Sequence, residues 1–164
     1  MATLGAIHHA TGEHREALAQ HGKALALASD LGYLSGELDA LIGLACANTR
    51  LAAHTTAEAQ ATNALTLARK SSHHLQEGQA LTALADNALA AGDAEAATQL
   101  AREALSSHDT TGYRLGKART LRTLGDAIHR QGGTALPYWQ AAQALFTEIG
   151  TPEADRPVDR TSTA

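Results

Sequence analysis

The sequence predicts an all-α protein, a solenoid of antiparallel helical hairpins with a 40-residue period and a right-handed superhelical twist. The first observation is composition: hydrophobic residues make up 44% of the chain but aromatic residues only 3%. Pleated sheets favour aromatic and β-branched side chains, whereas a chain rich in Ala and Leu favours helices that pack closely. The second observation is an internal repeat, because the sequence resembles itself when it is shifted by 40 residues.

Three features mark the repeat. A Leu followed by a small residue occurs at Leu4-Gly5, Leu44-Ala45, Leu84-Ala85 and Leu124-Gly125. A small residue follows eight positions after each Leu, at Gly12, Ala52, Gly92 and Gly132. An Ala-Leu pair closes each repeat, at Ala24-Leu25, Ala64-Leu65, Ala104-Leu105 and Ala144-Leu145.

Each period contains two expected helices, with turn residues between them. Helix starts are indicated by a capping-box pattern at 55–58, by Asp93, and by Thr134 with Pro137 in the first turn. Small residues such as Ala85 and Gly125 are expected to face the partner helix of their own hairpin, where larger side chains would separate the two helices. The expected helices are 1–11, 14–30, 35–52, 56–71, 75–91, 94–107, 114–131 and 135–149.

The repeat domain is expected to cover residues 1–150 as about four hairpins. The first hairpin is truncated, because 1–11 supplies only the end of its first helix. Solenoids usually cap such an end. We therefore expect a longer parent protein or a second subunit that covers it. Residues 151–164 contain Pro152 and Pro157 and are expected to form a flexible tail.

The succession of Leu-small, small, Ala and Ala-Leu positions resembles the tetratricopeptide repeat (TPR) family. The chain departs from that family in its period, which is 40 rather than about 34 residues. It also lacks the family's early tryptophan, its tyrosine and its closing proline.

The C-terminal part is also similar to the TPR region of actinobacterial transcriptional regulators of the SARP/AfsR type. The similar segments are Gly116–Leu121, Leu124–Ala127, Tyr138–Phe146 and Gly150–Asp155. That resemblance implies a sensor or regulatory domain of a larger regulator of antibiotic biosynthesis. The alternative is a stand-alone TPR scaffold or adaptor that works by self-association.

In TPR proteins the first helix of each hairpin lines a groove that binds the partner. Transferring those groove positions to this chain gives the candidate binding residues Asp39, Arg50, Gln79, Asp86, Arg119, Arg122, Asp126, His129 and Arg130. Arginine can bind a carboxylate or phosphate through two N–H groups. The expected partner is thus an acidic protein or peptide, another domain of the same regulator, or a small anion. The alternative interpretation is a solvated helix face with an internal Arg122–Asp126 pair.

Charge and hydropathy exclude several classes of partner. The net charge is −4 and the pI is about 6.1, which argues against direct contact with nucleic acid. No apolar run approaches the roughly 20 residues that span a bilayer. A cytoplasmic location is therefore expected.

No residue pattern indicates catalysis, a cofactor or a metal. Cys46 is the single cysteine and is expected to be a small buried residue. The nine histidines include no pair spaced i, i+4, so they are expected to be exposed and to bind no metal. Trp139 is expected to fill the core of the last hairpin.

Overall fold

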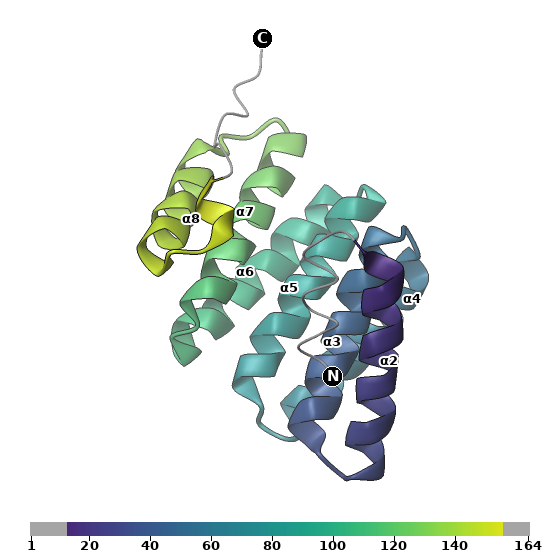
Figure 1. The fold of residues 1–164 in the computed structure, drawn as a ribbon. Coiled ribbons are helices and arrows are strands. Elements are labelled where there is room, and N and C mark those ends of the chain that lie inside the picture. Colours follow the sequence, from purple (N-terminus) through teal and green to yellow (C-terminus); the bar gives the residue numbers. More distant parts are fainter. Residues whose placement is uncertain (1–12, 156–164) are drawn as a thin grey trace.

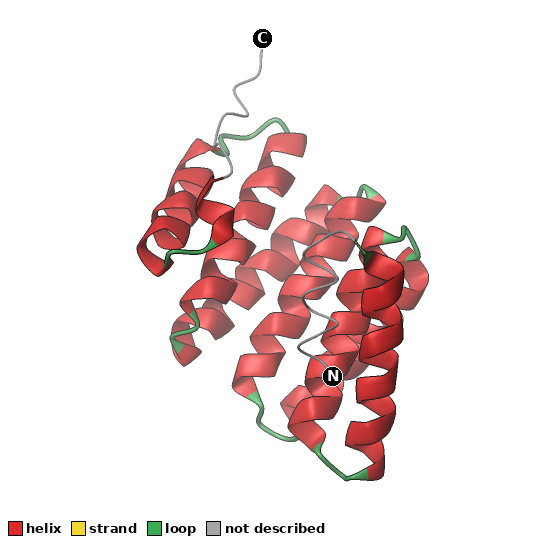
Figure 2. Cartoon of the chain, in the orientation of Figure 1, coloured by secondary structure: helices red, strands yellow, loops and turns green. Residues whose placement is uncertain are grey.

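The computed structural model describes residues 13–155, which form seven α-helices and one short 3-10 turn, η1, with no strand in that range (Figures 1 and 2). This confirms the all-α prediction for the described residues. The elements are α2 (His14–Asp30), α3 (Leu34–Arg50), α4 (His54–Lys70), α5 (His74–Ala91), α6 (Ala94–Thr111), α7 (Arg114–Arg130), α8 (Leu136–Ile149) and η1 (Pro152–Asp155).

Most helix bounds lie within two residues of the prediction, with three informative differences. The capping box was wrong, because α4 begins at His54 and Ala53 precedes it without a side-chain cap. Helix α6 continues to Thr111, beyond the expected end at 107. Residues 152–155, assigned to the tail, form η1 and contact α8. The Asp93 cap is confirmed, because its carboxylate accepts a hydrogen bond from the Ala96 amide at 2.9 Å. The expected helix 1–11 and residues 156–164 lie outside the described residues.

The connections from α2 through α7 to α8 share one turn geometry. In each, a residue with positive φ follows the helix, and the next amide bonds back to a helix carbonyl five residues earlier, as in a Schellman motif. Glycine is the usual occupant of such a position because it has no Cβ. Two of these turns use other residues, Ala52 at φ 57° and Ser72 at φ 58°. Placing Ala52 inside the expected helix 35–52 was therefore wrong.

The helices stack in order as a helical solenoid. Each helix contacts its neighbours in sequence, and α3 also contacts α5, which in turn contacts α7. In Figure 1, α2 and α8 lie at opposite ends of the array. The helices α3, α5 and α7 therefore form a continuous layer, which we call the odd-helix layer.

Alanine dominates the interior between the helices, which allows them to pack closely. Ala85 is fully buried and clusters with Ala101 of α6 and Leu124 of α7. Gly125 faces α8, since a Cβ there would lie 2.6 Å from Cδ1 of Trp139. Both small residues thus face the partner helix of their own hairpin, as expected.

Two histidines are buried, contrary to the expectation that all would be exposed. His21 is 4% exposed and His108 is 1% exposed. Each ring lies against a helix where a glycine leaves room for it: His21 against Gly43, and His108 against Gly78 and Gly116. The absence of a Cβ on the facing helix is what admits these rings.

His108 belongs to a buried polar network that joins three helices. Its Nε2 lies 3.0 Å from the Thr82 hydroxyl of α5, which lies 2.8 Å from the Thr120 hydroxyl of α7. The Thr82 hydroxyl also donates a hydrogen bond to the carbonyl of Gly78, and the Thr120 hydroxyl donates one to the carbonyl of Gly116, each at 2.9 Å. The network therefore connects the hairpin α5–α6 to the hairpin that follows it.

Replacing Gly43 with Ala should destabilise the fold although Ala is the better helix former. The new Cβ would lie 2.6 Å from Nε2 of His21, so the buried ring or the helix must move. We expect a net loss of about 1–2 kcal/mol in the free energy of unfolding, measured by denaturant titration. Gly22→Ala is the control, because no described atom lies within 4 Å of its Cβ position; it should gain up to about 1 kcal/mol. Equal effects of the two substitutions would contradict the packing of His21 on Gly43.

The free energy of unfolding should fall as the pH drops below about 6.5. Burial lowers the pKa of His21 and of His108 below the usual 6.5, although Asp109 partly opposes this at His108. Below pH 6.5 the unfolded chain binds protons that the folded chain does not, so acid favours unfolding. His108→Gln should reduce the slope between pH 6.5 and 5 by up to about 1.4 kcal/mol per pH unit. The exposed His74→Gln variant is the control, and identical slopes in the two variants would contradict a neutral buried His108.

Candidate functional site

All nine candidate binding residues lie on the three helices of the odd-helix layer. Asp39 and Arg50 lie on α3, Gln79 and Asp86 on α5, and the remaining five on α7. Side chains of this layer also bond across its helices, since Thr49 Oγ1 of α3 lies 3.2 Å from the Asn87 side chain of α5. The layer thus brings residues from three hairpins onto one continuous part of the molecule.

Asp86 lies at the centre of this layer and is half-buried. The Thr123 hydroxyl of α7 donates a hydrogen bond to Asp86 Oδ1 at 2.5 Å. Burial raises the pKa of Asp86, while the Thr123 bond and the charges of Arg50, Arg122 and Arg119 oppose that rise. Arginines of α3 and α7 therefore act on one carboxyl of α5. We call Arg50, Asp86, Arg119 and Arg122 the Arg–Asp cluster.

Cys46 lies beside this cluster on α3. Burial, and next the charge of Asp86, raise the pKa of its thiol to about 12, with partial opposition from Arg50 and Arg119. The side chain is half-buried and packs against the apolar core that includes Leu41. Since the thiolate is the nucleophilic form of cysteine, the chemistry at Cys46 does not favour nucleophilic catalysis.

Arg119 is bound by a carboxylate from the C-terminal turn. Its Nε and Nη2 both donate to Oε1 of Glu153 in η1, at 3.1 and 2.6 Å. The Arg119 side chain remains 47% exposed, whereas that of Glu153 is 16% exposed. Burial alone would raise the pKa of Glu153, but hydrogen bonds from Arg119 and its own backbone, and the charges of Arg119 and Arg122, outweigh it and lower the pKa.

Arg122 is held by α8. Its guanidinium carbon lies 5.3 Å from the centre of the buried Phe146 ring, within the range of a cation–π contact. Arg122 is half-buried rather than part of a freely solvated face. Its charge acts on the pKa of both Asp86 and Glu153.

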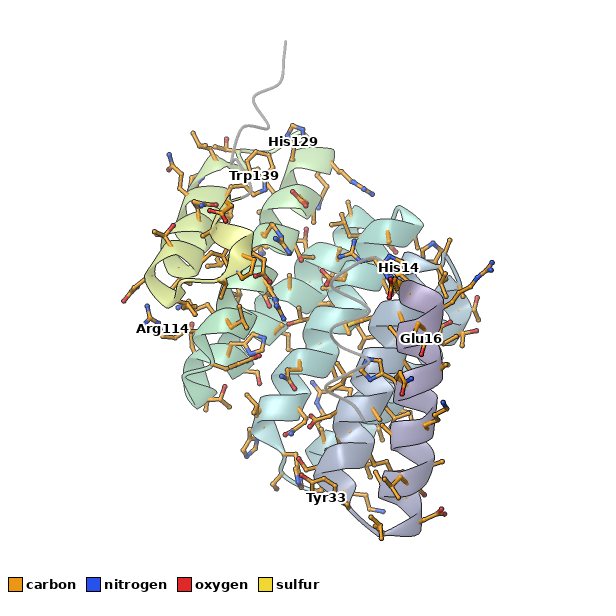
Figure 3. The ribbon with its side chains drawn as sticks, viewed as in Figure 1. His14, Glu16, Tyr33, Arg114, His129 and Trp139 are labelled. Carbon is orange, nitrogen blue, oxygen red and sulfur yellow. The ribbon has the colours of Figure 1, made fainter. Side chains whose placement is uncertain are left out.

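The other candidate residues on α7 contribute to packing. The Trp139 indole N–H donates to Asp126 Oδ1 at 3.0 Å, and the ring of His129 lies 5.4 Å from that of Trp139. Figure 3 shows His129 and Trp139 beside each other at one end of α7 and α8. Arg130 Nη1 donates to the carbonyl of Leu89 on α5 at 2.5 Å. Asp126, His129 and Arg130 therefore hold α7 against its neighbours. Trp139 fills the core of the last hairpin, as expected.

Asp39 and Gln79 lie in the first halves of α3 and α5. Asp39 is exposed and accepts a hydrogen bond from Gln76 at 3.3 Å, while Gln79 is half-buried. The structure thus groups four of the nine candidates, the Arg–Asp cluster, and adds Thr123 and Glu153. Sequence reasoning missed those two, because Thr123 looks like an ordinary helix residue and Glu153 was assigned to the tail.

Within residues 13–155, no helix combines the length and apolar character needed to cross a bilayer. In the same part of the chain, no group of three His, Cys, Asp or Glu side chains is arranged to hold a metal ion. No model of a known protein family matches the sequence, and neither does any curated protein.

Cys46 should react slowly with iodoacetamide at pH 8 in the folded protein. With a pKa of about 12 it is almost entirely a thiol, whereas an unfolded cysteine with a pKa near 8.5 is partly ionised. We expect alkylation at least about 100-fold slower than in denaturant, followed by mass spectrometry of this single cysteine. A native rate within about tenfold of the denatured rate would contradict the burial of the thiol.

Proposed function

We propose that this chain is a non-catalytic binding module of the TPR kind, and that its odd-helix layer binds a partner through the Arg–Asp cluster. Three guanidinium groups act on this part of the layer, in a chain whose net charge is −4. Local positive potential steers oppositely charged partners. The observation that carries the proposal is the half-buried Asp86, whose pKa is affected by the charges of arginines from two helices, α3 and α7.

The repeat arrangement supports the family part of the proposal. Helices α3, α5 and α7 begin at Leu34, His74 and Arg114, which are 40 residues apart. The first helices of the hairpins contact one another, as they do where a groove is formed in TPR proteins. The spacing of these helix starts supports a 40-residue period. The right-handed superhelix is proposed from the resemblance to TPR proteins.

We further propose that the module is the sensor or regulatory domain of a larger transcriptional regulator of secondary metabolism. The support is the resemblance of four C-terminal segments to SARP/AfsR-type regulators. Two of those segments contribute residues beside the cluster, namely Phe146 beneath Arg122 and Glu153 on Arg119. The segments that carry the resemblance therefore also contribute the surroundings of the candidate site.

A second candidate function is a scaffold or adaptor that self-associates. Three large apolar side chains are exposed near the end of α2: Leu27 at 48%, Leu31 at 71% and Tyr33 at 59%. Figure 3 places Tyr33 at the turn between α2 and α3, at the opposite end of the array from Trp139. Exposed apolar groups of this kind favour contact with another protein surface. Sedimentation that depends on protein concentration and is abolished by Leu31→Glu would favour this function.

Arg50 gives a direct test of the binding surface, because it lies in the cluster and on a different helix from Arg119. A fluorescein-labelled octaglutamate peptide serves as an acidic probe, with binding followed by fluorescence anisotropy. Arg50→Gln should weaken binding about tenfold at low salt, and the difference should shrink as salt screens the charges. Arg102→Gln on α6, outside the odd-helix layer, removes the same charge from an exposed position and should bind like wild type. If both variants weakened binding equally, the effect would come from the net charge of the protein, which would contradict a localised site.

A further inference from the structure

The contact between Arg119 and Glu153 shows that the Arg119 guanidinium can bind a carboxylate through two N–H groups. One carboxylate oxygen of Glu153 accepts hydrogen bonds from two N–H groups of Arg119, with Arg122 adding its charge nearby. An acidic side chain is therefore already bound at the edge of the proposed surface. This side chain belongs to η1, the four-residue turn that follows α8, and not to the odd-helix layer.

Polar contacts and one small apolar side chain attach η1 to the rest of the molecule. It packs on α8, where the Gln143 side chain donates a hydrogen bond to the carbonyl of Ala154, and its Glu153 is bound by Arg119 of α7. Ala154 also packs against the apolar cluster of α7 and α8 that contains Phe146. A segment with so few buried apolar contacts has a low free energy of local opening. Arg119, at 47% side-chain exposure, would then be open to another carboxylate.

We propose that Glu153 is an internal ligand, and that the Arg119–Arg122 site binds a carboxylate side chain of an acidic peptide segment in its place. This inference rests on the proposed function, because it assumes that the odd-helix layer is the binding surface. A peptide is favoured over a small carboxylate because the arginines of the cluster come from α3 and α7. Several acidic side chains along one segment can reach both helices at once.

Competition by Glu153 lowers the apparent affinity of the site. A ligand binds only the fraction of molecules in which Glu153 has left Arg119, so removing the internal carboxylate increases that fraction. Conversely, a bound acidic segment releases η1 from α7.

The test compares two substitutions that each remove one negative charge and one Arg–Glu ion pair. Glu153→Gln removes the internal ligand, whereas Glu148→Gln breaks the exposed pair with Arg114. We expect Glu153→Gln to bind labelled octaglutamate about tenfold more tightly than wild type, and Glu148→Gln to stay within about twofold. Glu153→Asp keeps the charge on a shorter side chain and should give an intermediate affinity. It replaces Glu153→Gln in the comparison if that variant does not fold.

Arg119→Gln supplies the second half of the test. In the Glu153→Gln background it should remove the gain in affinity. A gain that persists without Arg119, or an equal gain in Glu148→Gln, would overturn the internal-ligand role of Glu153. If wild type binds the peptide and Arg50→Gln weakens it, but Glu153→Gln binds no more tightly, the proposed function stands and this inference fails. No binding by any variant would overturn both.

Competition with small anions tests the class of ligand. At equal carboxylate concentration, unlabelled octaglutamate should displace the probe from Glu153→Gln at least tenfold more effectively than citrate. Citrate that competes equally would overturn the preference for a segment. Inorganic phosphate that competes better than citrate would overturn the preference for a carboxylate.

Discussion

Close approach of the helices over small side chains is the constraint on which the other features depend. Where the facing residue is glycine, a whole ring enters the space, as with His21 on Gly43 and Trp139 on Gly125. Threonine hydroxyls also bond from one helix to the next, as Thr82 of α5 does with Thr120 of α7. The same proximity brings the Thr123 hydroxyl to Asp86 and fixes the position of the Arg–Asp cluster.

The fold was largely readable from the sequence because its signals are local and repeated. Leu and Ala positions mark the buried helix faces, and glycines mark four of the six turns from α2 to α8. The turns at Ala52 and Ser72 were harder, because neither residue signals a positive φ. At both turns the amide that follows bonds back to a helix carbonyl, Ala53 to Asn48 and His73 to Ala68, although L-residues disfavour the positive φ.

The candidate site was predicted only in part, because equivalence within a repeat does not specify contacts between repeats. Residues 40 apart occupy matching places on different helices. Asp86 matches Asp126 of α7, but its hydrogen bond is with Thr123. That offset follows from how α7 packs against α5. The pairing of Arg119 with Glu153 depends on a turn after the last helix, for which the repeat gives no template. The sequence shows which side chains are charged, but it does not show which of them contact one another.

The network of His108, Thr82 and Thr120 sets a limit on how this array can be divided. Cutting the chain between α6 and α7 would remove the hydroxyl that meets Thr82, and would open the side of His108 that faces Gly116. A buried imidazole and hydroxyl would lose partners or meet water. The last two hairpins are therefore joined by buried polar contacts as well as by apolar packing. Asn87 of α5, bonded to Thr49 of α3 and His54 of α4, places a similar constraint on the junction before it.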